Sequence, residues 1–244
     1  MADRTQVEGA PRARRGLLSR IVGIVVAPGE TFADVVAAPK VLGVLLFVML
    51  VGTIAIGGFF FTEVGRKAWL DQAVSSTEAW GGQVNDEQYA GMERMAPFAG
   101  YFAIAQMVFG IPLVMLITAG ILFVVFNAAM GGRASFKQLF AVVAHSSVIS
   151  ALGWIFVMPL NYFRETMTSP TNLSVLAPNL EEGSFLARLL GTIDLFLIWW
   201  VIVLGIGLAV LYRRRTQPIV VTLLAVYAVI AVIIAGAMSA LGGS

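Results

Sequence analysis

The sequence contains no cysteine, one histidine and few charged residues. The lack of cysteine excludes a disulfide framework, a thiolate nucleophile and a cysteine metal site. The single histidine, His145, excludes a histidine-pair metal site within one chain. Charged residues make up 12% of the 244 residues, and soluble domains usually carry about twice that share. The net charge of +2 is too small to indicate a nucleic-acid partner.

The signatures of common catalytic sites are also missing. The chain has no HExxH zinc motif, no GxSxG nucleophile elbow and no phosphate-binding P-loop. We therefore predict that the protein is not an enzyme. We expect no cofactor and no metal site.

Long apolar runs dominate what is present. Five of them have about 20 or more mostly apolar residues, which is enough to cross a hydrocarbon core of roughly 30 Å. They cover residues 41–61, 98–130, 136–160, 189–212 and 219–241. The sequence therefore predicts an all-α membrane protein with five transmembrane helices.

Basic residues alternate in density between the connections, which predicts the orientation of the chain. Three segments that alternation places on one side hold 11 of the 16 basic residues. These residues are Arg4, Arg12, Arg14, Arg15, Arg20, Lys40, Arg133, Lys137, Arg213, Arg214 and Arg215. The two other connections are acidic on balance. Because cytoplasmic loops carry an excess of lysine and arginine, we expect the N-terminus inside and the C-terminus outside.

The chain divides into three parts by composition. Residues 1–16 are small, polar and charged, and predict a disordered basic N-terminus. Residues 17–40 predict two short amphipathic helices on the cytoplasmic interface, the second beginning at Pro28 with Phe32, Val35 and Val36 on one face. The alternative is that this segment packs under the bundle and seals the inner ends of the spans. Residues 41–244 form the five-span domain, and Asn85 is expected to cap a helix in its first outer loop.

Four polar side chains form the candidate intramembrane site. Ionisable groups within the spans are expensive and are functional candidates by default. Depth along the helices places Asp194 near the outer surface and His145 near the inner one, so a relay between them is not expected. We expect Asp194 to lie near Gln106, and His145 near Asn127. Each pair is either a structural contact between helices or, for Asp194, part of a substrate or ion site.

Three segments together resemble the Yip domain family, the Ypt/Rab-interacting-protein-like five-span membrane proteins. They are APGETFADVVAAP at residues 27–39, GGRASFKQLFAVVAHSS at 131–147 and GTIDLFLIWWVIVLGIGLAV at 191–210. The matching positions are Pro28, Phe32, Pro39, Gly131, Gly132, Phe136, Asp194, Phe196, Trp199 and Gly207. The resemblance implies a non-enzymatic membrane protein. The alanine-, valine- and arginine-rich composition suits a prokaryotic member in the cytoplasmic membrane, and an ER/Golgi-type membrane is the alternative.

Two functions are compatible with these features. The first is a membrane scaffold or membrane-shaping, trafficking-type factor whose partners are anionic lipid headgroups and other membrane proteins. The headgroups would be attracted by Arg12, Arg14, Arg15, Arg213, Arg214 and Arg215. The second is a small transporter in which Asp194 and Gln106 line an outward-facing cavity. An Asp194 packed dry among aromatic residues favours the scaffold, whereas a cavity reaching it from outside favours the transporter. The sequence does not set the oligomeric state.

Overall fold

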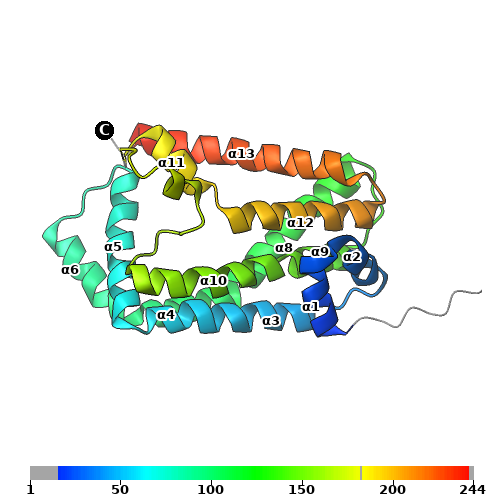
Figure 1. Cartoon of the computed structure of the whole chain (residues 1–244), viewed down its shortest axis with the longest axis horizontal. Helices are drawn as coiled ribbons and strands as arrows, with labels where there is room; N and C mark the ends of the chain where they lie inside the picture. Colours follow the sequence, from blue (N-terminus) through cyan, green and yellow to red (C-terminus); the bar gives the residue numbers. More distant parts are fainter. Residues whose placement is uncertain (1–15, 182, 242–244) are drawn as a thin grey trace, which may run out of the picture.

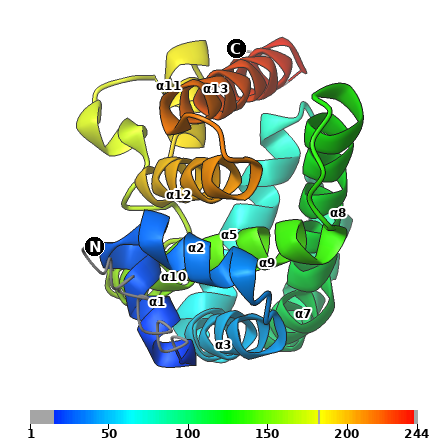
Figure 2. The same cartoon turned by 90° about the vertical axis from the view of Figure 1, so that its right-hand side faces the viewer.

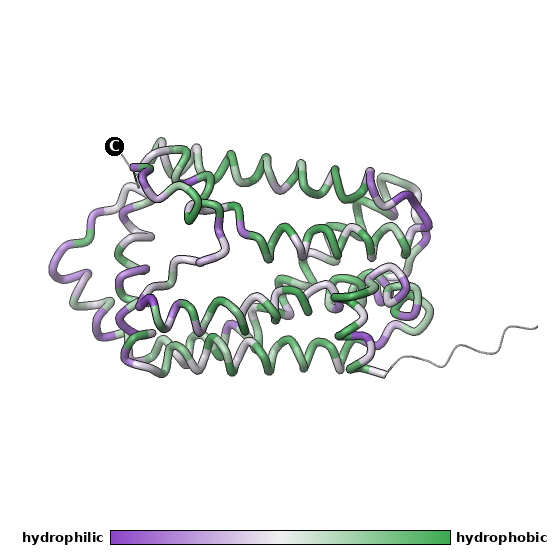
Figure 3. Tube along the Cα trace, in the orientation of Figure 1, coloured by the Kyte–Doolittle hydropathy of each residue, from purple (hydrophilic) through white to green (hydrophobic). Residues whose placement is uncertain are grey.

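Residues 16–181 and 183–241 are described by a computed structural model, and within these ranges every regular element is a helix. Five helical stretches of this part are long and apolar enough to cross a membrane. They are Leu42–Phe60, Asp86–Ala129, Phe136–Arg164, Leu195–Tyr212 and Thr216–Leu241. Apolar residues line the middle of these stretches and polar residues gather at their two ends (Figure 3). The predicted all-α, five-span fold class is confirmed.

Three of the spans are interrupted helices. The first contains α3 (Leu42–Gly52), η1 (Thr53–Gly57) and α4 (Gly58–Phe60). The second contains α6 (Asp86–Met95), η2 (Ala96–Phe98), α7 (Ala99–Ala105), η3 (Gln106–Gly110), α8 (Ile111–Phe123) and η4 (Val124–Ala129). The third contains α9 (Phe136–Ser146) and α10 (Val148–Arg164). The fourth and fifth are the single helices α12 (Leu195–Tyr212) and α13 (Thr216–Leu241).

The second span is longer than the apolar run 98–130 because an N-terminal cap starts its helix early. The side chain of Asn85 accepts from the backbone N–H of Gln88, and the Gln88 side chain accepts from the backbone N–H of Asn85. This capping box satisfies two orphan donors of α6 and confirms the expected Asn85 cap. Further along, the turn Gln106–Gly110 is π-helical just before Pro112, which lacks the N–H that an α-helix needs.

The third span lies at the centre of the bundle. In its most apolar 18-residue stretch, 67% of the residues are buried, against 17% in the corresponding stretches of the second and fifth spans. Figure 2 looks along the bundle and places α9 and α10 between α12 on one side and α3 and α8 on the other. The fourth span contacts α13, α9, α10 and α2, whereas α13 packs mainly on α12 and α11. The third and fourth spans therefore carry the packing core, and the second and fifth expose most of their apolar surface.

The fourth span begins at Leu195 and not at residue 189. The short helix α11 (Phe185–Thr192) ends at Ile193, whose backbone is extended, and Asp194 then caps a new helix. The apolar run 189–212 is therefore two helices with a break. Hydropathy misplaced this boundary because both sides of the break are apolar.

Two ends of the bundle are distinct (Figure 1). We call the end that holds α1 (Leu17–Val26) and α2 (Pro28–Ala37) the proximal end. The distal end holds α5 (Glu63–Ala79), α11 and the last turn of α13. The two helices expected over residues 17–40 are present, and α1 runs across the axes of the spans (Figure 1).

Candidate functional site

Helix α2 is anchored to the spans by one aromatic side chain. Phe32 is fully buried, and it lies over Gly207 of α12 beside Val142 of α9. A Cβ atom at position 207 would come within 3.0 Å of the Phe32 ring and 2.6 Å of Val142 Cγ1. Gly207 therefore leaves the space that the ring fills. Phe32 and Gly207, two of the positions that resemble the Yip domain family, thus form one contact.

Arg20 of α1 fixes the other end of α2. Its guanidinium donates to the carbonyl oxygens of Ala38 at 3.1 Å and Asp34 at 3.2 Å. These carbonyls lie at the C-terminal end of α2, where a cation complements the helix dipole. Only 3% of Arg20 is exposed. This role of Arg20 does not follow from its place among the basic residues of the N-terminal segment, because the contact joins two helices.

A glycine turn joins the second and third spans at the proximal end. Gly131 has φ of 69°, a left-handed conformation that favours glycine. A Cβ atom at Gly132 would lie 2.5 Å from the ring of Tyr212 and 2.7 Å from the carbonyl oxygen of Phe126. That space lets the Tyr212 ring stack on Phe126, with 4.9 Å between centroids. Asn127 holds the same turn by donating to the carbonyl oxygen of Ala134 at 2.7 Å.

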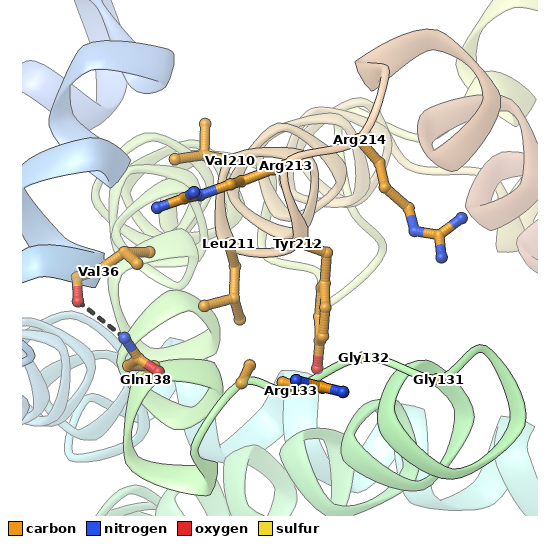
Figure 4. A pocket seen from close by; sticks show the side chains of 11 residues that line it. Val36, Gly131, Gly132, Arg133, Gln138, Val210, Leu211, Tyr212, Arg213 and Arg214 are labelled. Atoms are coloured by element: carbon orange, nitrogen blue, oxygen red, sulfur yellow. Dashed lines mark hydrogen bonds between the residues drawn. The ribbon is translucent and has the colours of Figure 1, made fainter.

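A pocket of about 450 Å³ opens between this turn and the turn from α12 to α13. In Figure 4, Arg213 and Arg214 leave the α12–α13 turn in different directions, and Arg133 lies on the opposite wall. Arg214 donates to the carbonyl oxygen of Met130 at 3.2 Å, which ties the two turns together. The eleven lining residues include no acid; they are Val36, Gly131, Gly132, Arg133, Ala134, Gln138, Val210, Leu211, Tyr212, Arg213 and Arg214.

Asp194 lies where a returning loop meets the start of α12. One carboxylate oxygen accepts from the backbone N–H groups of Phe196 at 2.8 Å and Leu197 at 3.3 Å. The other accepts from the hydroxyls of Ser169 at 2.7 Å and Thr171 at 2.6 Å. All four groups donate, so the carboxylate acts as an acceptor in a capping network.

The break before α12 is held from the fifth span as well. The Tyr227 hydroxyl donates to the carbonyl oxygen of Thr192 at 2.8 Å and accepts from the backbone N–H of Asp194 at 3.2 Å. Asn172 forms an isolated antiparallel bridge with Asp194. The backbone groups that the break frees therefore find partners, as membrane proteins require.

Gln106 does not join Asp194. Its side chain is exposed, and it lies over Gly110 of its own helix, where a Cβ atom would be 2.5 Å from the amide. The expected pairing of Asp194 with Gln106 is replaced by the contacts with Ser169 and Thr171. The reason is that the outer loop folds back onto the start of α12, which the depth argument did not foresee.

His145 and Asn127 do not form a pair either. The Nδ1–H of His145 donates to the carbonyl oxygen of Ala141 at 2.7 Å, within its own helix. Ser146 and Ser147 donate in the same way to the carbonyls four residues before them, at 2.9 and 3.1 Å. Such back-bonding bends helices, and here it accompanies the break between α9 and α10. His145 is thus part of a structural bend in the core.

The remaining signature residues shape helix ends and packing. Pro28 opens α2, Pro39 follows its C-terminal end, and Phe136 opens α9. Phe196 packs over Gly153 of α10, where a Cβ atom would be 3.0 Å from its ring, and lies 6.1 Å from the ring of Trp199. These contacts explain why aromatic residues follow Asp194.

Several of the expected and missed residues can now be placed. The disordered N-terminus was expected over residues 1–16, and of these only Gly16 is among the described residues. The expected headgroup residues Arg12, Arg14 and Arg15 therefore lie outside them. Arg213, Arg214 and Arg215 are all exposed; the first two line the pocket of about 450 Å³, which we call the proximal pocket, and Arg215 does not. The sequence pattern did not predict the residues that reach these sites from distant segments, namely Ser169, Thr171, Tyr212 and Tyr227.

No group of three or more histidine, cysteine, aspartate or glutamate residues that could hold a metal ion occurs in the part of the chain that the structure describes. The geometry instead defines a multi-pass helical membrane protein with an N-terminal helix pair packed on one end. The Yip1 domain matches residues 22–238, and the chain belongs to the Yip1 domain family. No match was found among curated proteins or among solved structures.

Proposed function

We propose that the protein is a non-enzymatic membrane scaffold that shapes the membrane in a trafficking-type role, with its proximal end on the cytoplasmic side and its C-terminus outside. Its expected partners are anionic lipids and other membrane proteins, and its expected location is a prokaryotic cytoplasmic membrane. Support for this orientation comes from the turns holding Arg133 and Arg213–Arg215, which share one end with Arg20 and α2. Family membership supports a membrane role without catalysis.

The observation that carries the proposal is the two-sided burial of α1. One side of this helix packs on the bundle, with Ile24 fully buried. The other side leaves Leu18, Val22 and Val26 at 76%, 59% and 72% exposed. These three residues are four apart and share a face. Because α1 runs across the span axes at the bundle end, this apolar face is suited to lie among lipid headgroups as a wedge.

The wedge is tested with Val22→Glu in the purified chain reconstituted into liposomes. A charge on this face should lift α1 from the headgroups, since burying a valine side chain contributes about 1.5–3 kcal/mol. We expect larger, less curved vesicles by electron cryomicroscopy than with the wild type. The matched control is Ser19→Glu, which adds the same charge at an exposed and already polar position of α1. Equal curvature with Val22→Glu and wild type would refute the wedge.

The orientation is tested by labelling single cysteines, because the chain has none of its own. Ser19→Cys at the proximal end should resist an impermeant maleimide in intact cells and react after lysis. Gln83→Cys, in the loop between α5 and α6, should react in intact cells. Reaction of both positions from the same side would overturn the five-crossing orientation.

The transporter alternative receives little support from the geometry at Asp194. Both carboxylate oxygens accept hydrogen bonds from protein donors, and Asp194 does not line the pocket at the proximal end. Ion or substrate flux into liposomes that is lost in Asp194→Asn would nevertheless replace the scaffold proposal. Thr171→Val is the control, because it removes one donor to the carboxylate and leaves the charge in place.

A further inference from the structure

The proximal pocket concentrates positive charge that the protein does not neutralise. The side chains of Arg133 and Arg213 make no hydrogen bond or ion pair with any described residue, and the Arg214 side chain uses one nitrogen for the Met130 carbonyl. Three guanidinium groups around one cavity of about 450 Å³ repel one another, and an anion between them removes that repulsion. Guanidinium groups match phosphate oxygens in a bidentate geometry.

Arg213 stands at a position where an arginine side chain is not needed for the turn. Its φ is 52°, in the left-handed region, and the next residue closes the helix through a bond from Arg214 N–H to the Ala209 carbonyl at 2.9 Å. Glycine is the usual residue at this place in a helix C-cap. A strained residue of this kind is a reason to look for a role of its side chain.

The position and walls of the pocket select the kind of anion. The pocket lies directly after Ala129 and Tyr212, where two spans end, so it sits at the depth of lipid headgroups. Beside the arginines its wall includes Val36, Val210 and Leu211. Basic pockets between transmembrane helices on the cytoplasmic side are typical sites for anionic lipid headgroups. The volume also falls within the range of about 300–1,000 Å³ of small-molecule sites.

We infer that this pocket binds the headgroup phosphate of an anionic phospholipid, with Arg133 and Arg213 facing it from opposite walls. The inference deepens the proposed function and rests on its placement of the proximal end at the membrane surface. It names a defined binding site, whereas the general attraction of basic residues to anionic lipids needs no pocket.

Native mass spectrometry of the full chain in detergent micelles tests the inference, with phosphatidylglycerol as the probe and phosphatidylcholine as the neutral lipid. Arg133→Gln and Arg213→Gly should each weaken retention of phosphatidylglycerol about fivefold, since one arginine near the surface contributes about 1 kcal/mol. Arg215→Gln is the matched control, because it removes the same charge at a residue that does not line the pocket, and a pocket-bound phosphate should therefore be retained better in this variant than in Arg133→Gln or Arg213→Gly.

Arg213→Gly also separates a binding role from a structural one. Glycine suits the left-handed backbone, so this variant should melt at the wild-type temperature or about 2–4 °C above it while losing lipid. If Arg215→Gln weakens retention as much as the two pocket variants, only net charge matters and the pocket is refuted. If inorganic phosphate displaces phosphatidylglycerol at equal concentration, the site takes free anions and the lipid assignment is wrong.

The outcomes distinguish this inference from the proposed function. Val22→Glu should change vesicle curvature and leave lipid retention intact, because α1 does not line the pocket. Unchanged retention in Arg133→Gln and Arg213→Gly would refute the pocket and leave the wedge standing. Wild-type retention of phosphatidylcholine equal to that of phosphatidylglycerol would refute the pocket in the same way.

Discussion

Replacing Gly207 by alanine should loosen α2 from the bundle. The added methyl group would sit 2.6 Å from Val142 Cγ1 and 3.0 Å from two ring atoms of Phe32. Both neighbours are fully buried, so neither has open space to move into. The added methyl group is therefore accommodated only by a costly shift of packed groups. The shift of lowest cost moves Phe32, because its helix lies at the edge of the bundle.

The size of the effect follows from the cost of overpacking, which is about 1–3 kcal/mol for an extra methylene in a packed core. For a chain of this size each kcal/mol lowers the melting temperature by about 2–4 °C, so Gly207→Ala should lower it by about 2–12 °C. Gly236→Ala is the matched control in the next span, because no heavy atom lies within 4 Å of the Cβ that it adds. That variant should be neutral or stabilising by about 0.5–1 kcal/mol.

The assay is thermal unfolding of the purified chain in detergent, combined with hydrogen exchange of α2. Exchange should rise in α2 in Gly207→Ala before it rises in the spans. A double-mutant cycle with Phe32→Leu then isolates the contact, since residues that touch couple by about 0.5–3 kcal/mol. Equal melting temperatures of Gly207→Ala and Gly236→Ala, or a cycle with no coupling energy between positions 32 and 207, would refute this contact.

Three further substitutions probe the other contacts. Arg20→Met should speed amide hydrogen exchange at the C-terminal end of α2, because it removes the charged hydrogen bonds from Arg20 to the carbonyls of that end, which contribute about 1.5–3 kcal/mol. Equal hydrogen exchange in the variant and the wild type would contradict this capping role of Arg20. Gly132→Ala should lower the melting temperature, since its Cβ meets the Tyr212 ring and a carbonyl oxygen, whereas Gly120→Ala, with open space around it, should not. Tyr227→Phe should lower the free energy of unfolding by about 1 kcal/mol, because the two hydrogen bonds of the Tyr227 hydroxyl at the α11–α12 break are lost. Tyr162→Phe, at an exposed position, should lower it less, and equal losses in both variants would argue against a role of Tyr227 at the break.

Local signals in the sequence were sufficient for most of the secondary structure. The capping box at Asn85 and the helix that begins at Pro28 follow from residues next to each other in the chain. The start of the fourth span did not follow, although Asp194 is a strong N-cap residue. The apolar residues on both sides of the break extended the run to residue 189 and outweighed the single polar residue.

The partners of the polar residues in the spans did not follow from the sequence. Asp194, His145 and Asn127 are all partly or fully withdrawn from the surface and all make specific hydrogen bonds. Asp194 is bonded by the returning loop, His145 bonds to its own helix and Asn127 bonds within a tight turn. None of the three is bonded to another of them. Depth along ideal helices ignores loops that fold back and side chains that bond to their own backbone.

Hydropathy along the chain was enough to predict an all-helical protein with five membrane-spanning stretches, because the free energy of placing a helix in lipid is close to a sum over the residues of that helix. Two arrangements came from the packing of the folded chain: Phe32 fills the space over Gly207, and Arg133 and Arg213 line one pocket. Those contacts depend on how separate helices and turns converge at the proximal end. Convergence is set by packing between distant segments, which no local pattern of hydropathy or charge encodes.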